Sequence, residues 1–167
     1  MTEVFPVKYV LMRTDLPTMN PGKGMAQADH NGAAFVYDML TQKFPNTEAN
    51  ERNHALYEMW RNSTSQNFGT VLTLGVNEAQ MRASVEVAQK LFLVSGIIHD
   101  PSYPILVAPE LAKALETDLN PDTKIQIGDG YHYVTIPLDT CAYIFGDKND
   151  PALQAVVGNF GRYSLHP

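Results

Sequence analysis

The first forty residues constrain the fold most, because a strand pattern there leads through a short loop into a helical pattern. Residues 7–13 (VKYVLMR) are mostly β-branched, aromatic or apolar, which predicts a buried strand. Residues 14–22 (TDLPTMNPG) are rich in turn-forming residues. From residue 23 to about residue 42 the apolar side chains recur with helical spacing. A strand that feeds a helix through a short loop is typical of an α/β domain.

The same two patterns alternate through much of the remaining chain. We expect strands at residues 69–76, 93–100 and 140–146, and helices at residues 77–92 and 150–160. Asn77 and Asp150 each precede a helical pattern, where a side-chain oxygen can accept from the unpaired N–H groups of the first turn. This order predicts an α/β fold, a three-layer α/β/α sandwich on a mixed four-stranded sheet.

Two segments do not fit this alternation, and we interpret them as insertions in one domain that spans residues 1–167. Residues 43–67 are polar and are expected to be peripheral, although a short helix there could pack Leu56 and Trp60 on the body. Residues 106–137 are expected to add a short helix at 109–116 and a β-hairpin at 122–137, whose turn is the sequence Gly-Asp-Gly.

Composition limits the class of protein. A chain of 167 residues with 44% hydrophobic and 18% charged residues is about the size and composition of one folded domain. It has no run of roughly 18 apolar residues and no basic leader at its start, so we expect a cytoplasmic protein without a membrane partner. Its net charge of −6 disfavours general nucleic-acid binding, so any phosphate-binding surface must be local.

The predicted first helix carries the most informative polar residues. Lys23, Gln27 and Asn31 are spaced by four, which places them along one helix face, and His30 lies beside them. Lys23 falls in the first helical turn, where unpaired N–H groups and the helix dipole favour an anion. A solvated helix face with an exposed lysine has the same spacing, so spacing alone leaves both interpretations open.

Asp100 is the second candidate. It follows the apolar residues of a predicted strand and precedes the turn-like sequence Pro-Ser-Tyr-Pro. Functional side chains often lie where strands of α/β sheets end. An aspartate before a proline also commonly caps local backbone N–H groups, so position alone does not decide between a site residue and a turn residue.

Other common sites are not supported by the sequence. The segment Pro-Gly-Lys-Gly lacks the first glycine of a phosphate-binding P-loop, since Pro17 stands there, and Gly24 replaces the required Ser or Thr. The histidines show no metal-ligand spacing, and no Gly-x-Ser-x-Gly motif is present. Cys141, the single cysteine, lies in an apolar run and is interpreted as a core residue.

Residues 9–35 (YVLMRTDLPTMNPGKGMAQADHNGAAF) resemble the signature of the type 2 peptidyl-tRNA hydrolase family. In that signature a V-x-R-x-D-L strand end leads through a Gly-Lys loop into an A-Q-x-x-H helix. Residues 97–105 (IIHDPSYPI) resemble the family's D-A-G-x-T-Q loop, and residues 140–146 with the following helix resemble its last strand and helix. The positions in register with the first motif are Arg13, Asp15, Leu16, Gly22, Lys23, Ala26, Gln27 and His30.

The resemblance implies an α/β/α sandwich that cleaves the ester between a peptide, or an N-blocked amino acid, and the 3′ end of tRNA, without a metal or organic cofactor. Lys23 would steady the oxyanion or the terminal phosphate, and Asp100 would orient or deprotonate the attacking water. His30 would complete the catalytic set and help to position the substrate. The expected substrate-binding residues are Arg13, Asp15, Gln27, Asn31 and Tyr103, although Arg13 and Asp15 are expected to pair with each other rather than with tRNA.

The chain also departs from the family pattern. Pro21 stands where the family has the first lysine of G-K-G-K, and Pro104 stands where its loop has a threonine hydroxyl. Ser102 or Tyr103 could supply a hydroxyl instead. These departures and the added segments motivate an alternative, a noncatalytic binding module on the same fold. The sequence leaves the oligomeric state open, with a homodimer as one option.

Overall fold

The computed structural model describes residues 3–41, 46–108, 124–128 and 131–158. The sheet strands are β1 (Pro6–Arg13), β2 (Val71–Val76), β3 (Val94–Val107), β4 (Lys124–Gly128) and β5 (Tyr131–Asp147). The central strand order is β2-β1-β5-β3, in which β1 and β2 are parallel and the other pairs antiparallel, and β4 pairs with β5. The sheet is therefore mixed, as predicted.

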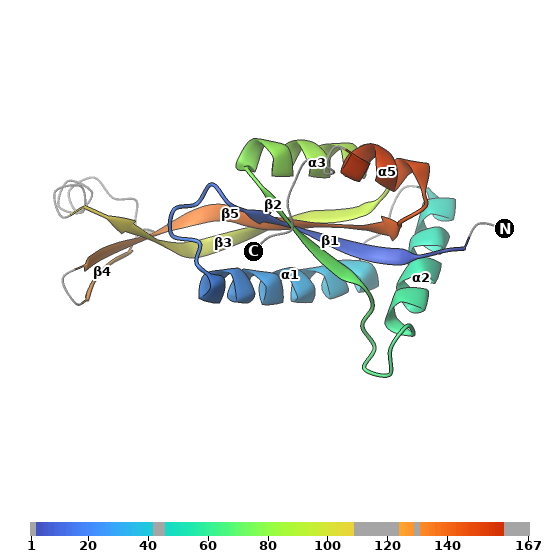
Figure 1. Cartoon of the computed structure of the whole chain (residues 1–167), viewed down its shortest axis with the longest axis horizontal. Helices are drawn as coiled ribbons and strands as arrows, with labels where there is room; N and C mark the ends of the chain where they lie inside the picture. The colour runs from blue at the N-terminus through green and yellow to red at the C-terminus, as the bar shows by residue number, and fades with distance from the viewer. Residues whose placement is uncertain (1–2, 42–45, 109–123, 129–130, 159–167) are drawn as a thin grey trace.

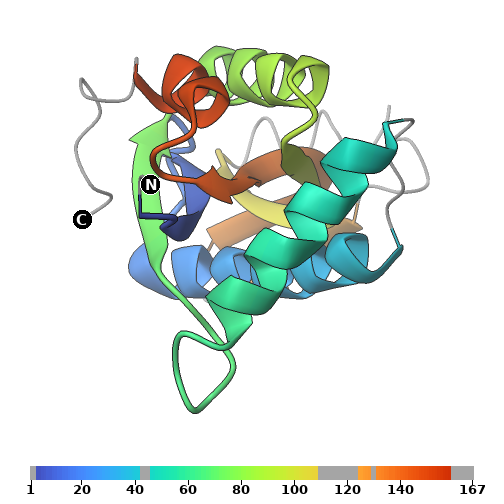
Figure 2. The ribbon, with the colours of Figure 1, turned by 90° about the vertical axis from the view of Figure 1, so that its right-hand side faces the viewer.

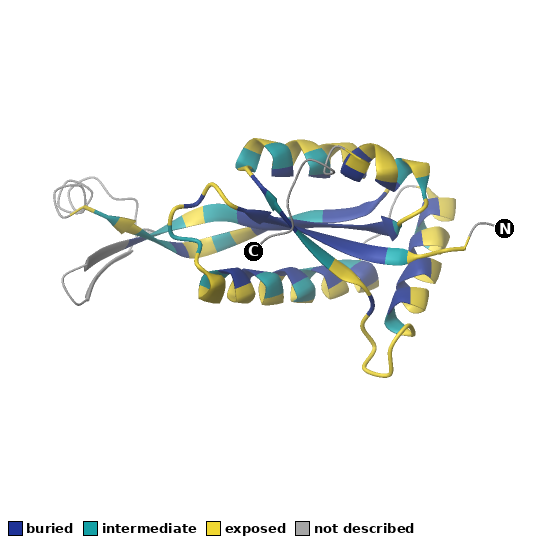
Figure 3. Ribbon diagram, viewed as in Figure 1, coloured by how far each residue is buried: buried dark blue, intermediate teal, exposed yellow. Residues whose placement is uncertain are grey.

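Helices cover both faces of this sheet. Helices α1 (Pro21–Thr41) and α2 (Thr47–Arg61) lie on one side, and α3 (Glu78–Lys90) and α5 (Pro151–Val157) lie on the other (Figure 1). The dark, buried sides of α1 and α3 face the sheet between them (Figure 3). The predicted three-layer α/β/α arrangement is confirmed.

Strand β1 supplies side chains to two separate cores because successive residues of a strand point to opposite faces. Val7, Tyr9 and Leu11 pack with α3 and α5. Val10 and Met12 pack with α1 and α2. Every residue of β1 after Pro6 is buried, as expected for a strand with helices on both sides.

The predicted helix caps are confirmed. The Asn77 side chain accepts from the backbone N–H of Gln80, and the Gln80 side chain accepts from the backbone N–H of Asn77. The Asp150 side chain accepts from the backbone N–H of Ala152. Helix α1 begins at Pro21, two residues before the predicted start, and the Asn20 side chain accepts from the backbone N–H of Lys23.

The short helix considered within residues 43–67 is confirmed as α2, which packs Leu56 and Trp60 on the body, so the expectation that this segment is peripheral is wrong for α2. Leu56, Tyr57 and Trp60 are each at most 7% exposed and belong to the core under α1. The Phe35 ring lies edge-on to the rings of Tyr57 and Trp60, with centroids 5.8 and 5.5 Å apart. Figure 2 shows α2 running diagonally across this end of the molecule. The polar outer face of α2 dominates its composition and hides this apolar stripe.

The expected turn after Asp100 is also wrong, since β3 continues to Val107. The register passes from Asp100 opposite Leu138 to Tyr103 opposite Ile136, so β3 holds one more residue than β5 over this interval. Prolines are tolerated in a bulge on an edge strand, because they remove few ladder hydrogen bonds there. Asp100 therefore lies inside a long strand rather than at its end.

The predicted hairpin at residues 122–137 and the predicted last strand at residues 140–146 share one continuous strand, β5. Antiparallel pairing of β4 with β5 confirms the hairpin. Beyond the helices, β3, β5 and β4 form an arm that projects from the body (Figure 1). The predicted helix at residues 109–116 lies outside the described residues.

Close packing between α2 and the lead-in to β2 gives a test of the role of α2. A Cβ on Gly69 would lie 2.6 Å from the Trp60 carbonyl oxygen. Gly69→Ala should therefore lower the free energy of unfolding by about 1–3 kcal/mol in urea denaturation, because backbone must move. Gly32→Ala is the control, since its Cβ meets nothing within 4 Å and should be neutral or stabilising. Equal stability of Gly69→Ala and the wild type would show that α2 is not firmly packed there.

Candidate functional site

The first turn of α1, the loop before it and the bulge of β3 meet on one side of the sheet. The Lys23 ammonium donates to the Pro104 carbonyl at 2.7 Å and lies 4.9 Å from the centre of the Tyr103 ring. The Thr18 hydroxyl, from the preceding loop, donates to the same carbonyl at 3.3 Å. These contacts tie the helix N-terminus to the irregular part of β3.

Gln27 occupies the centre of this site and is 4% exposed. Its side-chain amide donates to Asp100 Oδ2 at 2.7 Å, and its side-chain oxygen accepts from the Thr140 hydroxyl at 2.5 Å. Because a carboxylate can only accept here, the direction of both hydrogen bonds is fixed. Gln27 thus holds α1, β3 and β5 together through one side chain.

Asp100 is held on both sides but remains partly exposed. Its second oxygen accepts from the backbone N–H of Ser102 at 2.9 Å, across the bulge. Each carboxylate oxygen still has lone pairs for a further donor such as water. The bulge therefore turns a strand aspartate into a fixed, accessible acceptor.

Lys23 is the nearby cation on α1. Partial burial lowers the pKa of its ammonium from the ordinary value of a lysine. No carboxylate of a described residue lies within 4.0 Å of this ammonium, so a carbonyl oxygen is its strongest contact. A group that needs an anion and holds only a neutral oxygen is suited to receive a ligand oxyanion.

Other residues expected at the site have different surroundings. Tyr103 is fully buried, and its hydroxyl lies against Thr18 and Met19, so its ring supports Lys23 from below. Asn31 is fully buried between α1 and the sheet. His30 is exposed on α1, one helical turn beyond Gln27, and no hydrogen bond to its ring from a described residue is seen.

Arg13 and Asp15 pair with each other, as expected. Two nitrogens of the Arg13 guanidinium donate to the two oxygens of Asp15 at 2.9 and 3.0 Å, and the same group contacts Glu78 and the Asp139 carbonyl. This pairing holds the pKa of Asp15 below its usual range. Arg13 is 5% exposed, so it ties the end of β1 to α3 and β5 instead of facing solvent.

Two polar residues near the site were missed from the sequence. Lys8 lies inside the apolar pattern of residues 7–13, Thr140 is the first residue of the predicted strand 140–146, and both are almost fully buried. The signal for Lys8 was an isolated charged group in a run that is otherwise apolar, because such a group requires a buried partner.

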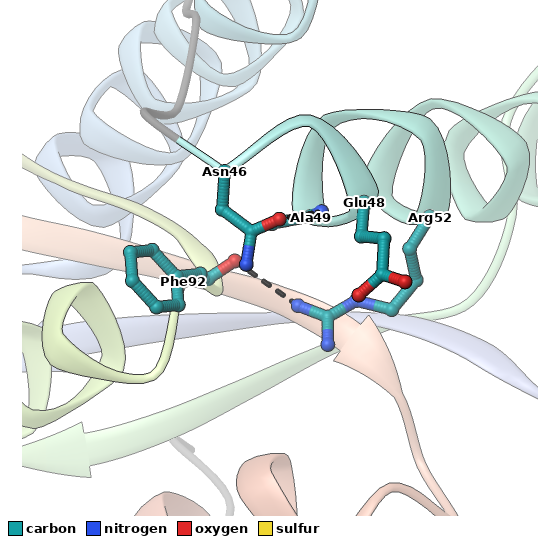
Figure 4. A pocket seen from close by; sticks show the side chains of 5 residues that line it. All are labelled: Asn46, Glu48, Ala49, Arg52 and Phe92. Carbon is teal, nitrogen blue, oxygen red and sulfur yellow. Dashed lines mark hydrogen bonds between the residues drawn. The ribbon is translucent and has the colours of Figure 1, made fainter.

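A separate pocket of about 340 Å³ lies at the start of α2 and is lined by Asn46, Glu48, Ala49, Arg52 and Phe92. Figure 4 shows these side chains, with the Arg52 guanidinium bonded to the Phe92 carbonyl at 3.2 Å. Phe92 adopts a left-handed backbone conformation with φ of 57°. None of the lining residues belongs to the Lys23 site, and the pocket brings no cluster of candidate reactive groups together.

Among the described residues, no helix has both the length and the apolar character needed to cross a membrane. Within the same residues no group of three or more His, Cys, Asp and Glu side chains could hold a metal ion. Comparison with protein-family models and with curated proteins found no match to this chain.

The Thr140 hydroxyl provides a direct test of the Gln27 bridge. Thr140→Val keeps the side-chain shape but leaves the buried Gln27 oxygen without its donor, which should cost about 1–3 kcal/mol. Urea denaturation measures the loss. Thr41→Val is the control, since the Thr41 hydroxyl donates to the Tyr37 carbonyl at an exposed helix end. A loss no larger in Thr140→Val than in the control would contradict the bridge.

Proposed function

We propose that this protein hydrolyses the ester that joins a peptide, or an N-blocked amino acid, to the 3′ end of tRNA. The observation that carries the proposal is that Lys23 and Gln27, both on α1, each contact the bulged part of β3, Lys23 through the Pro104 carbonyl and Gln27 through Asp100. Ester hydrolysis needs an activated water and a stabilised oxyanion. Asp100 offers an acceptor for the proton of the water, and Lys23 offers a cation for the oxyanion.

In this mechanism Asp100 binds the attacking water and accepts its proton as the water attacks the ester carbonyl. Lys23 leaves the Pro104 carbonyl and donates to the oxyanion that forms on the substrate. As the oxyanion collapses, the bond between the acyl carbon and the tRNA 3′ oxygen breaks, and that oxygen takes the proton from Asp100. Gln27, held by Thr140, keeps the Asp100 carboxylate in a fixed orientation. His30 lies at the exposed edge of the same helix, where it could contact the substrate.

The resemblance of residues 9–35 to type 2 peptidyl-tRNA hydrolases supports the same substrate. The contact of Lys23 with the strand that carries Asp100 agrees with the roles that the resemblance implies. If the substrate is tRNA, the protein acts in the cytoplasm. Asn31, Tyr103 and Arg13, which the resemblance suggested as substrate-binding residues, are each at most 5% exposed, so substrate contacts are not proposed for them.

One observation favours a second function, a noncatalytic module that binds a partner at the same place. The Lys23 ammonium donates to a neutral carbonyl of its own chain, that of Pro104, and Pro21 supplies no second cation at the helix start. A module of this kind would use the site to recognise a chain end or a carbonyl group without breaking a bond.

Turnover by two variants tests the proposed function. Lys23→Ala should lower the hydrolysis of N-acetylated aminoacyl-tRNA by a factor on the order of 10² to 10³, because it removes an oxyanion donor. Asp100→Asn should also lower it, because an amide does not accept the proton. Release of the acyl amino acid is measured for both variants and for the double variant, whose loss should be less than the product of the two.

Matched controls are Lys90→Ala and Asp29→Asn, which remove an exposed ammonium and an exposed carboxylate elsewhere. Both should keep wild-type turnover. Wild-type rates in Lys23→Ala and Asp100→Asn would reject the site. No release by the wild type on several acylated tRNAs would reject the hydrolase and favour the binding module.

Salt dependence tests the tRNA part of the proposal separately. With a net charge of −6 the protein must rely on a few phosphate contacts, so tRNA affinity should fall as salt rises from 50 to 200 mM. For two or three contacts the expected fall is roughly tenfold to fortyfold. Fluorescence anisotropy with labelled tRNA measures it, and affinity that does not change with salt would argue against a tRNA ligand.

A further inference from the structure

Lys8 is a lysine buried in the middle of β1, beneath helix α1. Its side chain is on the α1 side of the sheet, where the ammonium lies 3.3 Å from Asn31 Oδ1 and 5.2 Å from the centre of the Phe35 ring. The residue is 5% exposed. A buried ammonium is costly unless it is paired, and no carboxylate of a described residue lies within 4.0 Å of it.

A chain of hydrogen bonds leads from Lys8 toward the Lys23 site. Asn31 Nδ2 lies 3.8 Å from Cys141 Sγ, and Cys141 Sγ lies 3.5 Å from the Gln27 carbonyl oxygen. The side chain of Gln27 in turn contacts Asp100 and Thr140. We call the four residues Lys8, Asn31, Cys141 and Gln27 the buried track.

The direction of the buried track is set by its first member. An ammonium only donates, so Asn31 must turn its oxygen toward Lys8 and its nitrogen toward the thiol. The sulfur then accepts from Asn31, and the S–H group donates to the Gln27 carbonyl. Asn31 and Cys141 are both fully buried, so water does not compete for these bonds.

We propose that Lys8 is a positioning residue for the Lys23 site, which fixes Asn31 and Cys141 so that α1 holds Gln27 against Asp100. Its part in turnover rests on the proposed ester hydrolysis. Its part in placing Gln27 does not, because that contact exists in the protein without substrate.

Burial also shifts the pKa of Lys8, so its titration can be followed. Desolvation lowers its pKa to about 8, whereas the same desolvation raises the pKa of the Cys141 thiol to about 11. Other ionisable groups on this side of the sheet include Asp38 and the exposed His30 of α1, Tyr57 of α2, Tyr143 of β5 and, at the site, Lys23, Asp100 and Tyr103. The Tyr143 hydroxyl donates to Asp38, and burial raises its pKa.

The test follows the side-chain amide of Gln27 by NMR from pH 6.5 to 9.5 in the folded, full-length protein. Its resonances should move with a midpoint near pH 8 in the wild type and in the control Lys90→Met, in which an exposed lysine is lost. They should show no such midpoint in Lys8→Met. Absence of a midpoint near pH 8 in the wild type, or its persistence in Lys8→Met, would overturn the proposal.

A second pair of variants cuts the track at the thiol without touching Lys8. Cys141→Ser keeps a donor and an acceptor and should keep the coupling, whereas Cys141→Ala removes both and should abolish it. If Cys141 only filled space in the core, Cys141→Ser and Cys141→Ala would change the coupling to a similar extent, because serine and alanine are both small. Coupling that survives in Cys141→Ala as strongly as in Cys141→Ser would overturn the track as the route.

Turnover adds the link to function. Lys8→Met should lower kcat about tenfold with KM nearly unchanged, since small misplacements far from the chemistry are costly. Unchanged kcat in Lys8→Met, with an active wild type, would overturn the positioning role. An inactive wild type would reject the ester hydrolysis alone, and the NMR titration would still decide whether Lys8 places Gln27.

Discussion

The side chain of Gln27 is the contact on which the proposed site depends. It hydrogen bonds from α1 to both β3 and β5, through Asp100 and Thr140. A glutamine can serve in this way because its amide has a donor end and an acceptor end. Asp100 requires the donor end and the Thr140 hydroxyl takes the acceptor end, so only one orientation satisfies both. Burial makes that orientation strict, because water cannot replace either partner.

The bulge in strand β3 places the other residues of this site. A regular strand would alternate its side chains strictly between the two faces, whereas the bulge shifts the register between Asp100 and Tyr103. Tyr103 then lies beneath Lys23, and the Pro104 carbonyl faces the Lys23 ammonium. Next to Asp100 on β3, His99 lies opposite Asp139 of β5, and Asp139 faces the other side of the sheet and pairs with His99 and Arg82. The two sides of the sheet thus carry separate polar clusters at the same level of β5.

Much of the fold could be predicted from the sequence, because strand and helix periods and the caps at Asn77 and Asp150 are local signals. For α2 the sequence indicated a short helix with Leu56 and Trp60 toward the body, but the polar outer residues outnumber this stripe, so the segment as a whole was expected to be peripheral. The continuation of β3 was also hidden. A proline usually marks a turn, and only the pairing with β5 shows that an edge strand can carry one in a bulge.

For the site, helical spacing correctly grouped Lys23, Gln27 and Asn31 on one face of α1. It could not show how that face lies on the sheet. Lys23 is partly exposed in the first turn of α1, Gln27 one turn later is buried, and Asn31 is buried completely. The partners of Gln27 and Asn31, which are Thr140 and Lys8, come from strands distant in sequence, so these contacts are seen only once the chain is folded.

The central claim is that an acylated tRNA end binds where Lys23, Gln27 and Asp100 meet. The most direct measurement is NMR shift mapping with a short RNA that ends in CCA and carries an N-acetylaminoacyl group through a stable 3′-amide. We predict that the largest shifts fall on the first turns of α1 and on the β3 bulge, and that Lys23→Ala weakens them. Shifts centred on another surface, such as the pocket of Arg52 and Phe92, or no shifts at millimolar RNA, would contradict the account.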